Sequence, residues 1–416
     1  MVGGGYWNKS LGSHSTVGGG RENQAEAEAA TIGGGSQNFV LSMEAVIAGG
    51  VTNLIGTNSP RAVIAGGFYN KVFAAKATVG GGAGNHIQSG ALDAVIAGGG
   101  ANDIESDAIG GAVSGGFGNG IRAGATNGVI SGGLLNRVGR RSHHGVVAGG
   151  ERNEIGADSV AAVIGGGAHN FIRTNAVSTV IDGGEDNEVG ANSGHSAIAG
   201  GLLNRIGDSA PYAFIAGGRS NRVLGAYGFA AGYRARANHP GSFVWADSTG
   251  GTLTSSSSNQ FRARASGGVR FYTDPDDTVG VSLPAGGTSW NTLSDRNAKK
   301  DFATVDPREV LEKLSRVPVQ SWRYRNETES STPHLGPTAQ DFKAAFFPGR
   351  DDKTISTLEF DGVELAAIQG LNQKLEAEVK AKDQRIGQLE TRLAELERLM
   401  RQALESRPVE ARSTQP

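Results

Sequence analysis

The sequence predicts a mainly β protein. We expect an N-terminal β-solenoid of 14 repeats with 15–17 residues each, a short β neck, and a small α+β domain that ends in a long α-helical coiled coil. Three observations lead to this prediction. A Gly-Gly-x-x-Asn unit recurs in nearly constant register, a Val or Ile follows most of these asparagines at a fixed distance, and apolar residues near the C-terminus recur in heptads.

The repeat is defined by its asparagines. Consecutive spacings are 15 residues three times, then 17, then 15, and then 17 eight times. A Val or Ile stands two residues after the asparagine in twelve of the fourteen units. The asparagines are Asn8, Asn23, Asn38, Asn53, Asn70, Asn85, Asn102, Asn119, Asn136, Asn153, Asn170, Asn187, Asn204 and Asn221.

A unit of this length is too short for a pair of helices but fits one solenoid coil with two brief strands. Glycine permits positive φ at the corner, and we expect the asparagine to adopt the left-handed conformation and to hydrogen-bond the turn backbone. Fourteen layers at about 4.8 Å each give a rod of about 65 Å. A disordered glycine-rich linker is the alternative, and the constant phase argues against it.

The phase changes after Val223. Residues 228–237 predict a last, altered coil that caps the stack, and residues 242–247, 260–265 and 269–273 predict strands. His239 lies beside a Pro-Gly turn and Asp274-Pro275-Asp276-Asp277 forms an acidic turn. We interpret both as structural.

The C-terminal part has ordinary composition. Asp306 followed by Pro307 predicts a helix start, and residues 319–324 alternate like a strand. A long helix then carries heptads in which nine of eleven seam positions are apolar, which predicts a coiled coil. The a positions are Leu365, Asn372, Val379, Ile386, Leu393 and Met400, and the d positions are Ile368, Leu375, Lys382, Leu389 and Leu396.

Composition excludes several functions. The net charge of −2 gives no reason to expect a nucleic-acid partner, and the absence of cysteine excludes disulfides and thiolate metal sites. No metal-ligand spacing or phosphate-binding loop is present, so we predict no metal and no cofactor. There is no apolar run of 18 residues and no signal peptide, so we predict no membrane insertion. The chain opens inside a repeat, so we expect the natural product to continue upstream.

The chemistry concentrates at the junction Leu293-Ser294-Asp295-Arg296. A serine hydroxyl is a weak nucleophile that needs a base, and Lys299 stands five residues after Ser294. A lysine serves as a base only when burial lowers its pKa far below about 10.4. The alternative is a helix cap at Ser294-Asp295, with Asp295 and Lys299 as an exposed i,i+4 pair.

Two resemblances extend this interpretation. The repeat resembles the head repeats of trimeric autotransporter adhesins, which implies a left-handed β-roll in a homotrimer. The C-terminal half resembles the peptidase S74 family, the intramolecular chaperone of endosialidases and phage tail spikes. The motifs that carry this second resemblance are Leu293-Ser294-Asp295-Arg296 with Lys299-Lys300, Trp322-Arg323-Tyr324, His334-Leu335-Gly336-Pro337, Ala339-Gln340-Asp341-Phe342, and Gly362-Val363 with Ala366-Ala367-Ile368-Gln369-Gly370-Leu371.

The S74 resemblance implies a chaperone domain that guides trimer folding and then cuts itself off. Ser294 and Lys299 would be the catalytic dyad, the cut would fall between Ser294 and Asp295, and His334 and Gln340 would support cleavage or trimer packing. A serine that attacks its own carbonyl would form a four-membered ring. The hydroxyl would therefore come from a neighbouring subunit, or Ser294 would attack the bond that joins it to Leu293; assistance by the Asp295 carboxylate is a third route.

The predicted protein is a trimeric fibre, tail spike or adhesin-like protein on a virion or cell surface, with itself and a host-surface glycan or protein receptor as partners. A non-cleaving structural trimer and a solenoid that binds or degrades polysaccharide are the alternatives. The predicted domains are the solenoid at 1–223, the capping coil and neck at 224–293, the S74 core at 294–363, the coiled coil at 364–403 and a disordered tail at 404–416.

Overall fold

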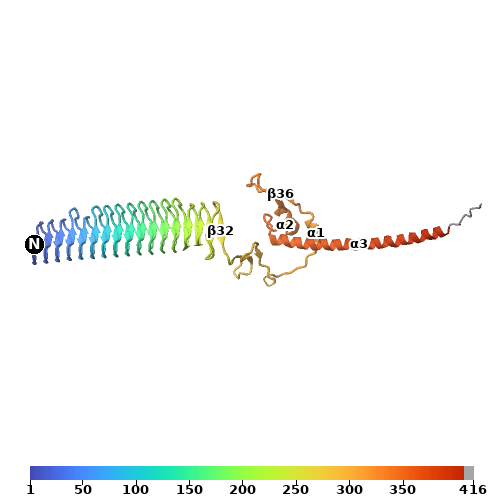
Figure 1. Cartoon of the computed structure of the whole chain (residues 1–416), viewed down its shortest axis with the longest axis horizontal. Helices are drawn as coiled ribbons and strands as arrows, with labels where there is room; N and C mark the ends of the chain where they lie inside the picture. The colour runs from blue at the N-terminus through green and yellow to red at the C-terminus, as the bar shows by residue number, and fades with distance from the viewer. Residues whose placement is uncertain (407–416) are drawn as a thin grey trace, which may run out of the picture. The chain divides into compact units, whose positions relative to one another are not determined.

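The computed structural model describes residues 1–406. The chain divides into two compact units, with the division between Gly268 and Val269. The first is a β-solenoid (Figure 1), and the second holds the helices. The predicted mainly β fold with a solenoid, a small neck and a long C-terminal helix is confirmed.

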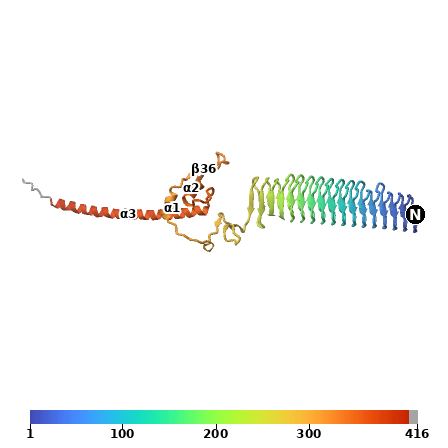
Figure 2. The same cartoon turned by 180° about the vertical axis from the view of Figure 1, so that it is seen from behind.

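The solenoid consists of two sheets of 16 strands each. Odd-numbered strands form one sheet and even-numbered strands the other, and every pair is parallel and one coil apart, as in Val129↔Val146. A third ladder of single-residue bridges runs from Tyr6↔Arg21 to Leu202↔Arg219. Each coil therefore has three faces, and the coils stack as successive rungs (Figure 2).

The odd strands are β1 (Lys9–Ser10), β3 (Gln24–Ala25), β5 (Phe39–Val40), β7 (Leu54–Ile55), β9 (Lys71–Val72), β11 (His86–Ile87), β13 (Asp103–Ile104), β15 (Gly120–Ile121), β17 (Arg137–Val138), β19 (Glu154–Ile155), β21 (Phe171–Ile172), β23 (Glu188–Val189), β25 (Arg205–Ile206), β27 (Arg222–Val223), β29 (Ala235–Ala237) and β31 (Leu253–Thr254). The even strands are β2 (Thr16–Val17), β4 (Thr31–Ile32), β6 (Val46–Ile47), β8 (Val63–Ile64), β10 (Thr78–Val79), β12 (Val95–Ile96), β14 (Ala112–Val113), β16 (Val129–Ile130), β18 (Val146–Val147), β20 (Val163–Ile164), β22 (Val180–Ile181), β24 (Ala197–Ile198), β26 (Phe214–Arg219), β28 (Phe229–Tyr233), β30 (Phe243–Ala246) and β32 (Phe261–Arg264).

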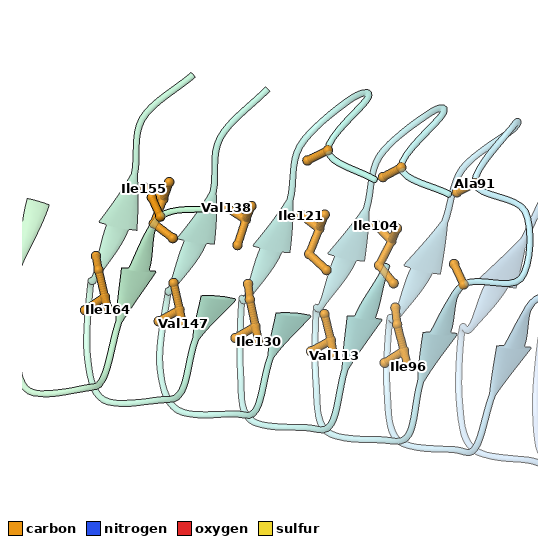
Figure 3. Packing of buried hydrophobic residues seen from close by; sticks show 14 of the residues in the cluster. Ala91, Ile96, Ile104, Val113, Ile121, Ile130, Val138, Val147, Ile155 and Ile164 are labelled. Carbon is orange, nitrogen blue, oxygen red and sulfur yellow. The ribbon is translucent and has the colours of Figure 1, made fainter. Parts of the chain in front are cut away.

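The core is a double ladder of aliphatic side chains. The second residue of nearly every two-residue strand points inward, and Ile104, Ile130 and Ile155 are completely buried. Figure 3 shows these side chains aligned from coil to coil on the two sheets. One coil alone could not bury them, so the stack supplies the hydrophobic stabilisation.

The coils of 15 and 17 residues differ at one corner only. Five residues separate β1 from β2 (11–15), whereas seven separate β13 from β14 (105–111). Strand register is kept on both sides of the corner, as in Asp103↔Gly120 and Ala112↔Val129. The two extra residues therefore enlarge a loop and leave the core unchanged.

The conserved-looking asparagine forms a buried ladder along the stack. The Asn153 amide nitrogen donates to the carbonyls of Gly149 at 2.8 Å and of Gly167 in the next coil at 2.9 Å. Its Oδ1 accepts the backbone N–H of Asn170 at 3.0 Å. The predicted hydrogen bonds to the turn backbone are thus present, and they also join neighbouring coils.

The expected left-handed conformation of asparagine is wrong. The residue before it takes that conformation instead, as in Arg152 with φ 52°, together with Gly150 at φ 88°. The asparagine enters the odd strand directly, so its backbone is extended and its side chain is free to reach two carbonyls. At Gly150 a Cβ would lie 2.0 Å from the Gly167 carbonyl oxygen, so glycine is required there for space as well.

The stack continues beyond Val223. Ala235 takes the place of an asparagine, and its N–H donates to Asn221 Oδ1 at 2.9 Å. Two of the strands predicted for the neck, at 242–247 and 260–265, are β30 and β32 of the even sheet. The neck strand predicted at 269–273 is β33 (Gly268–Tyr272), which forms a three-stranded sheet with β34 (Gly280–Pro284) and β35 (Asn291–Thr292).

The second unit contains three α-helices and a small hairpin-like sheet. These are α1 (Pro307–Leu314), α2 (Ala339–Phe346), α3 (Thr357–Glu405), and the antiparallel pair β36 (Gln320–Trp322) and β37 (His334–Gly336). Asp306 caps α1 through its side chain, which accepts the Arg308 N–H, as expected. The helix α3 begins at Thr357, earlier than the predicted 364, because Asp361-Gly362 continues the helix instead of turning. Of the predicted tail at 404–416, residues 404 and 405 still belong to α3, and 407–416 lie outside the described residues.

Helix α1 packs closely against α3. A Cβ placed on Gly370 would lie 2.1 Å from the carbonyl oxygen of Pro307, so only glycine allows this approach. The Arg308 guanidinium also donates to the Gln373 carbonyl at 3.1 Å. Glycine in a helix interior costs about 1 kcal/mol relative to alanine, and here the tight contact offsets that cost.

Candidate functional site

The junction folds into one tight turn after β35. Leu293 and Ser294 leave the sheet, and Asp295 caps a 3₁₀-helix, η1 (Arg296–Ala298), by accepting the Asn297 N–H at 2.9 Å. This turn reverses the chain direction. Lys299 therefore returns to Ser294, and its ammonium group hydrogen-bonds Ser294 Oγ.

The structure combines parts of both sequence interpretations. Asp295 does act as a cap, as the alternative to catalysis supposed. The Lys299 side chain, however, turns to Ser294 rather than to Asp295. The cap thus holds the turn in which nucleophile and lysine meet, and the contact between a hydroxyl and an amine is the geometry that a Ser–Lys pair requires.

The contact is open to solvent in a single chain. Ser294, Asp295 and Lys299 are all exposed, and Leu293 is 39% exposed. An open hollow beside them is lined by Asp277, Thr278, Leu293, Asp295, Asn297 and Ala298. An ammonium that is fully hydrated stays charged at neutral pH and cannot accept a proton, so general-base chemistry here requires that something cover the site.

His334 lies in a separate cluster. Its ring stacks on Trp322 with centroids 4.7 Å apart, and Nε2 lies 3.0 Å from Glu327 Oε1. The hydrogen bond from His334, followed by that from the Tyr324 N–H, lowers the pKa of the Glu327 carboxyl. Gln340 is exposed in the first turn of α2. Among residues 1–406, the hydrogen bonds of Ser294 and Lys299 include neither of these two side chains.

Sequence reasoning missed a buried ion pair between α2 and α3. Lys343 has a side chain only 8% exposed, and it pairs with Glu359, which also lies 3.3 Å from Arg350. The hydrogen bond from Lys343 lowers the pKa of Glu359. Phe342, which is completely buried, packs beside this pair against Phe360. The apolar stripe of α2 could have indicated this core, but nothing in the sequence marks which acid Lys343 meets.

The predicted seam of α3 is uncovered. All nine apolar a and d residues are between 48% and 64% exposed in the single chain. A helix of 49 residues with such a stripe buries it only against other helices. The exposed seam therefore indicates that α3 associates with further helices.

Comparison with known families addresses the segment that begins at the dyad. Residues 294–349 match the Peptidase S74 family, chaperone of endosialidase. The match starts at Ser294 itself and ends after α2, so this S74 segment contains the junction turn, α1, the β36–β37 pair and α2. The predicted resemblance is confirmed over these residues. No curated protein matches the chain.

Two further searches of residues 1–406 complete the survey. None of the helices there has the length and apolar character that crossing a bilayer requires. No group of three or more His, Asp or Glu side chains in the same range is arranged to hold a metal ion.

Proposed function

We propose that this chain is a trimeric tail-fibre or adhesin-like protein whose S74 segment guides trimer assembly and then releases itself by cleavage at Ser294–Asp295. The solenoid would be the lasting product on a virion or cell surface, where it would meet a host glycan or protein receptor. The observation that carries the proposal is the contact of Lys299 with Ser294, at the first residue of the S74 match and directly after the β segment.

Assembly has a physical reason in this fold. Parallel coils pair residues that are far apart from any local turn signal, and every unit offers nearly the same register to its neighbours. Strands of this kind fold slowly and risk misregister. A C-terminal helix that holds three chains together raises their effective concentration before the solenoids form.

Cleavage would then depend on assembly. In a single chain the dyad is hydrated, and a neighbouring subunit that covers the open hollow beside Leu293 would favour the neutral lysine. The same neighbour would also supply a serine hydroxyl that can reach the Ser294 carbonyl without a four-membered ring. Loss of the S74 segment after folding would make unfolding hard to reverse, because the template is gone.

A denaturing gel of wild type, Ser294→Ala and Lys299→Ala tests the cleavage. From a total of 42.7 kDa we expect wild-type pieces of about 29 and 13 kDa, and both variants should remain whole. Lys300→Ala is the matched control, because Lys300 is the next lysine and carries no contact to Ser294. Wild type that stays whole after folding would favour the non-cleaving structural trimer.

The N-terminal residue of the small piece separates the chemical routes. Asp295 at that position indicates attack on the Ser294 carbonyl. Ser294 at that position indicates that the hydroxyl attacked the preceding bond from Leu293. Dilution distinguishes a hydroxyl supplied by a neighbour, since such cleavage slows when trimers do not form.

A further inference from the structure

The three faces of the solenoid differ in charge. One face is formed by the outward residues of the odd strands, one by the single-residue bridges and one by the outward residues of the even strands, which we call the even face. The comparison is internal, since all three faces run along the same coils and meet the same solvent unless something covers them.

The even face is uncharged at every strand start. All 16 even strands begin with Thr, Val, Ala or Phe, and these residues are partly or fully exposed in the single chain. The residue two positions later is Gly, Ala or Ser in fourteen strands, the exceptions being Asp182 and Trp245. The face is therefore a flat, apolar strip with small side chains along one edge.

The other two faces do not share this pattern. Eight of the odd strands begin with a charged residue, for example Arg137 and Glu154. The row of bridges contains Arg21, Glu151, Glu185 and Arg219. Solvent contact alone therefore does not explain why charge is absent from the even face.

Four phenylalanines end the even face. Phe214, Phe229, Phe243 and Phe261 start the last four even strands, with ring centroids 5.8, 4.3 and 4.8 Å apart in sequence. Phe214 is 39% and Phe261 72% exposed. Aromatic rings this exposed are typical of an interface that is incomplete in the single chain.

The pattern favours a second copy over a different partner. The strip keeps its composition over all 16 strands, whereas a globular partner would need only a local patch. Identical copies have the same coil spacing and match rung for rung. In a cyclic assembly each residue near the axis lies beside its own copies, so a charged residue there would repel itself, and an uncharged face is what such symmetry requires.

We propose that three copies of the solenoid meet with their even faces toward a common axis. The number of copies rests on the proposed function, whereas the choice of face rests on the charge pattern. Fifteen intervals of about 4.8 Å give a strip about 70 Å long, and a width of about 10 Å gives roughly 700 Å² on each copy. A typical stable interface buries about 800 Å² per partner, so the strip is large enough.

Single cysteines test the face, because the chain has none of its own. Val146→Cys lies on the even face, and Arg137→Cys is the matched control at the outward position of the odd strand in the same coil. Leu389→Cys in the seam of α3 reports assembly of the helices independently. Each full-length variant is folded, treated with a short bismaleimide and examined on a denaturing gel.

We expect Val146→Cys to cross-link between chains at least about fivefold more than Arg137→Cys, with Leu389→Cys cross-linked as well. Cross-linking of Leu389→Cys but equal, low values for the other two would overturn the even face and leave the proposed function standing. Absence of cross-links in all three would overturn both. Val163→Cys, one coil further, replaces Val146→Cys if that variant fails to fold.

Discussion

Removing one asparagine from the buried ladder should open the solenoid locally. In Asn153→Ala the carbonyl of Gly149 and the N–H of Asn170 lose their side-chain partners, while the Gly167 carbonyl keeps the Glu151 N–H at 2.9 Å. Two buried groups left without partners cost about 1–3 kcal/mol each. We therefore expect the local opening free energy to fall by about 2–5 kcal/mol.

Hydrogen exchange followed by mass spectrometry measures this change in the full chain. A loss of about 2–5 kcal/mol corresponds to exchange roughly 30-fold to 4,000-fold faster in peptides that span residues 149–170. Because each coil contacts only its neighbours, peptides several coils away should exchange as in wild type.

Asn192→Gly is the control for this experiment. Asn192 is an exposed corner residue with φ 57°, a conformation that glycine adopts freely, and its side chain accepts one hydrogen bond from Asn175. We expect a change below about 0.5 kcal/mol. Wild-type exchange rates around coil 149–170 in Asn153→Ala would refute the role assigned to the ladder.

Two further predictions concern the helices. Gly370→Ala should push α1 away from α3 and lower the free energy of unfolding of the helical unit by about 2–3 kcal/mol, as followed by thermal melting, because the new Cβ would meet the Pro307 carbonyl; Gly387→Ala, where nothing lies within 4 Å, should be neutral or stabilising by up to about 1 kcal/mol. Equal melting of the two variants would contradict the close approach. Leu389→Lys should weaken self-association at least about tenfold in sedimentation experiments, whereas Thr391→Lys on the outer side of the same helix should not; unchanged association of both would contradict the seam.

The sequence was most informative where the structure is periodic. Constant spacing of the asparagines and the Val or Ile two residues later identified the coils and their core, because a stacked fold repeats every requirement in every unit. The same reasoning placed strands at 242–247 and 260–265 but not their partners, since pairing to β28 is a long-range choice that no local pattern specifies.

Conformational detail was less predictable. Asparagine was expected at the left-handed position because it is the turn residue that tolerates it, but Arg152 occupies that position and Asn153 is extended. The strain falls on a variable residue because the amide of Asn153 must point inward to satisfy two carbonyls. Sequence preference gave the residue type that the corner needs, and hydrogen bonding between coils decided where it stands.

The site divides in the same way. Ser294 and Lys299 are close in sequence, so one turn sufficed to bring them together as predicted. His334 was grouped with them through family motifs, yet its hydrogen bonds lie with Glu327. Its position depends on the pairing of β36 with β37, which the spacing of motifs does not determine.

Native mass spectrometry of the freshly folded full-length protein tests the central proposal most directly. We expect an assembly of three solenoid pieces of about 29 kDa each, with the pieces of about 13 kDa released or bound, and three uncut chains for Ser294→Ala. A single uncut species of 42.7 kDa from wild type would contradict both the assembly and the cleavage.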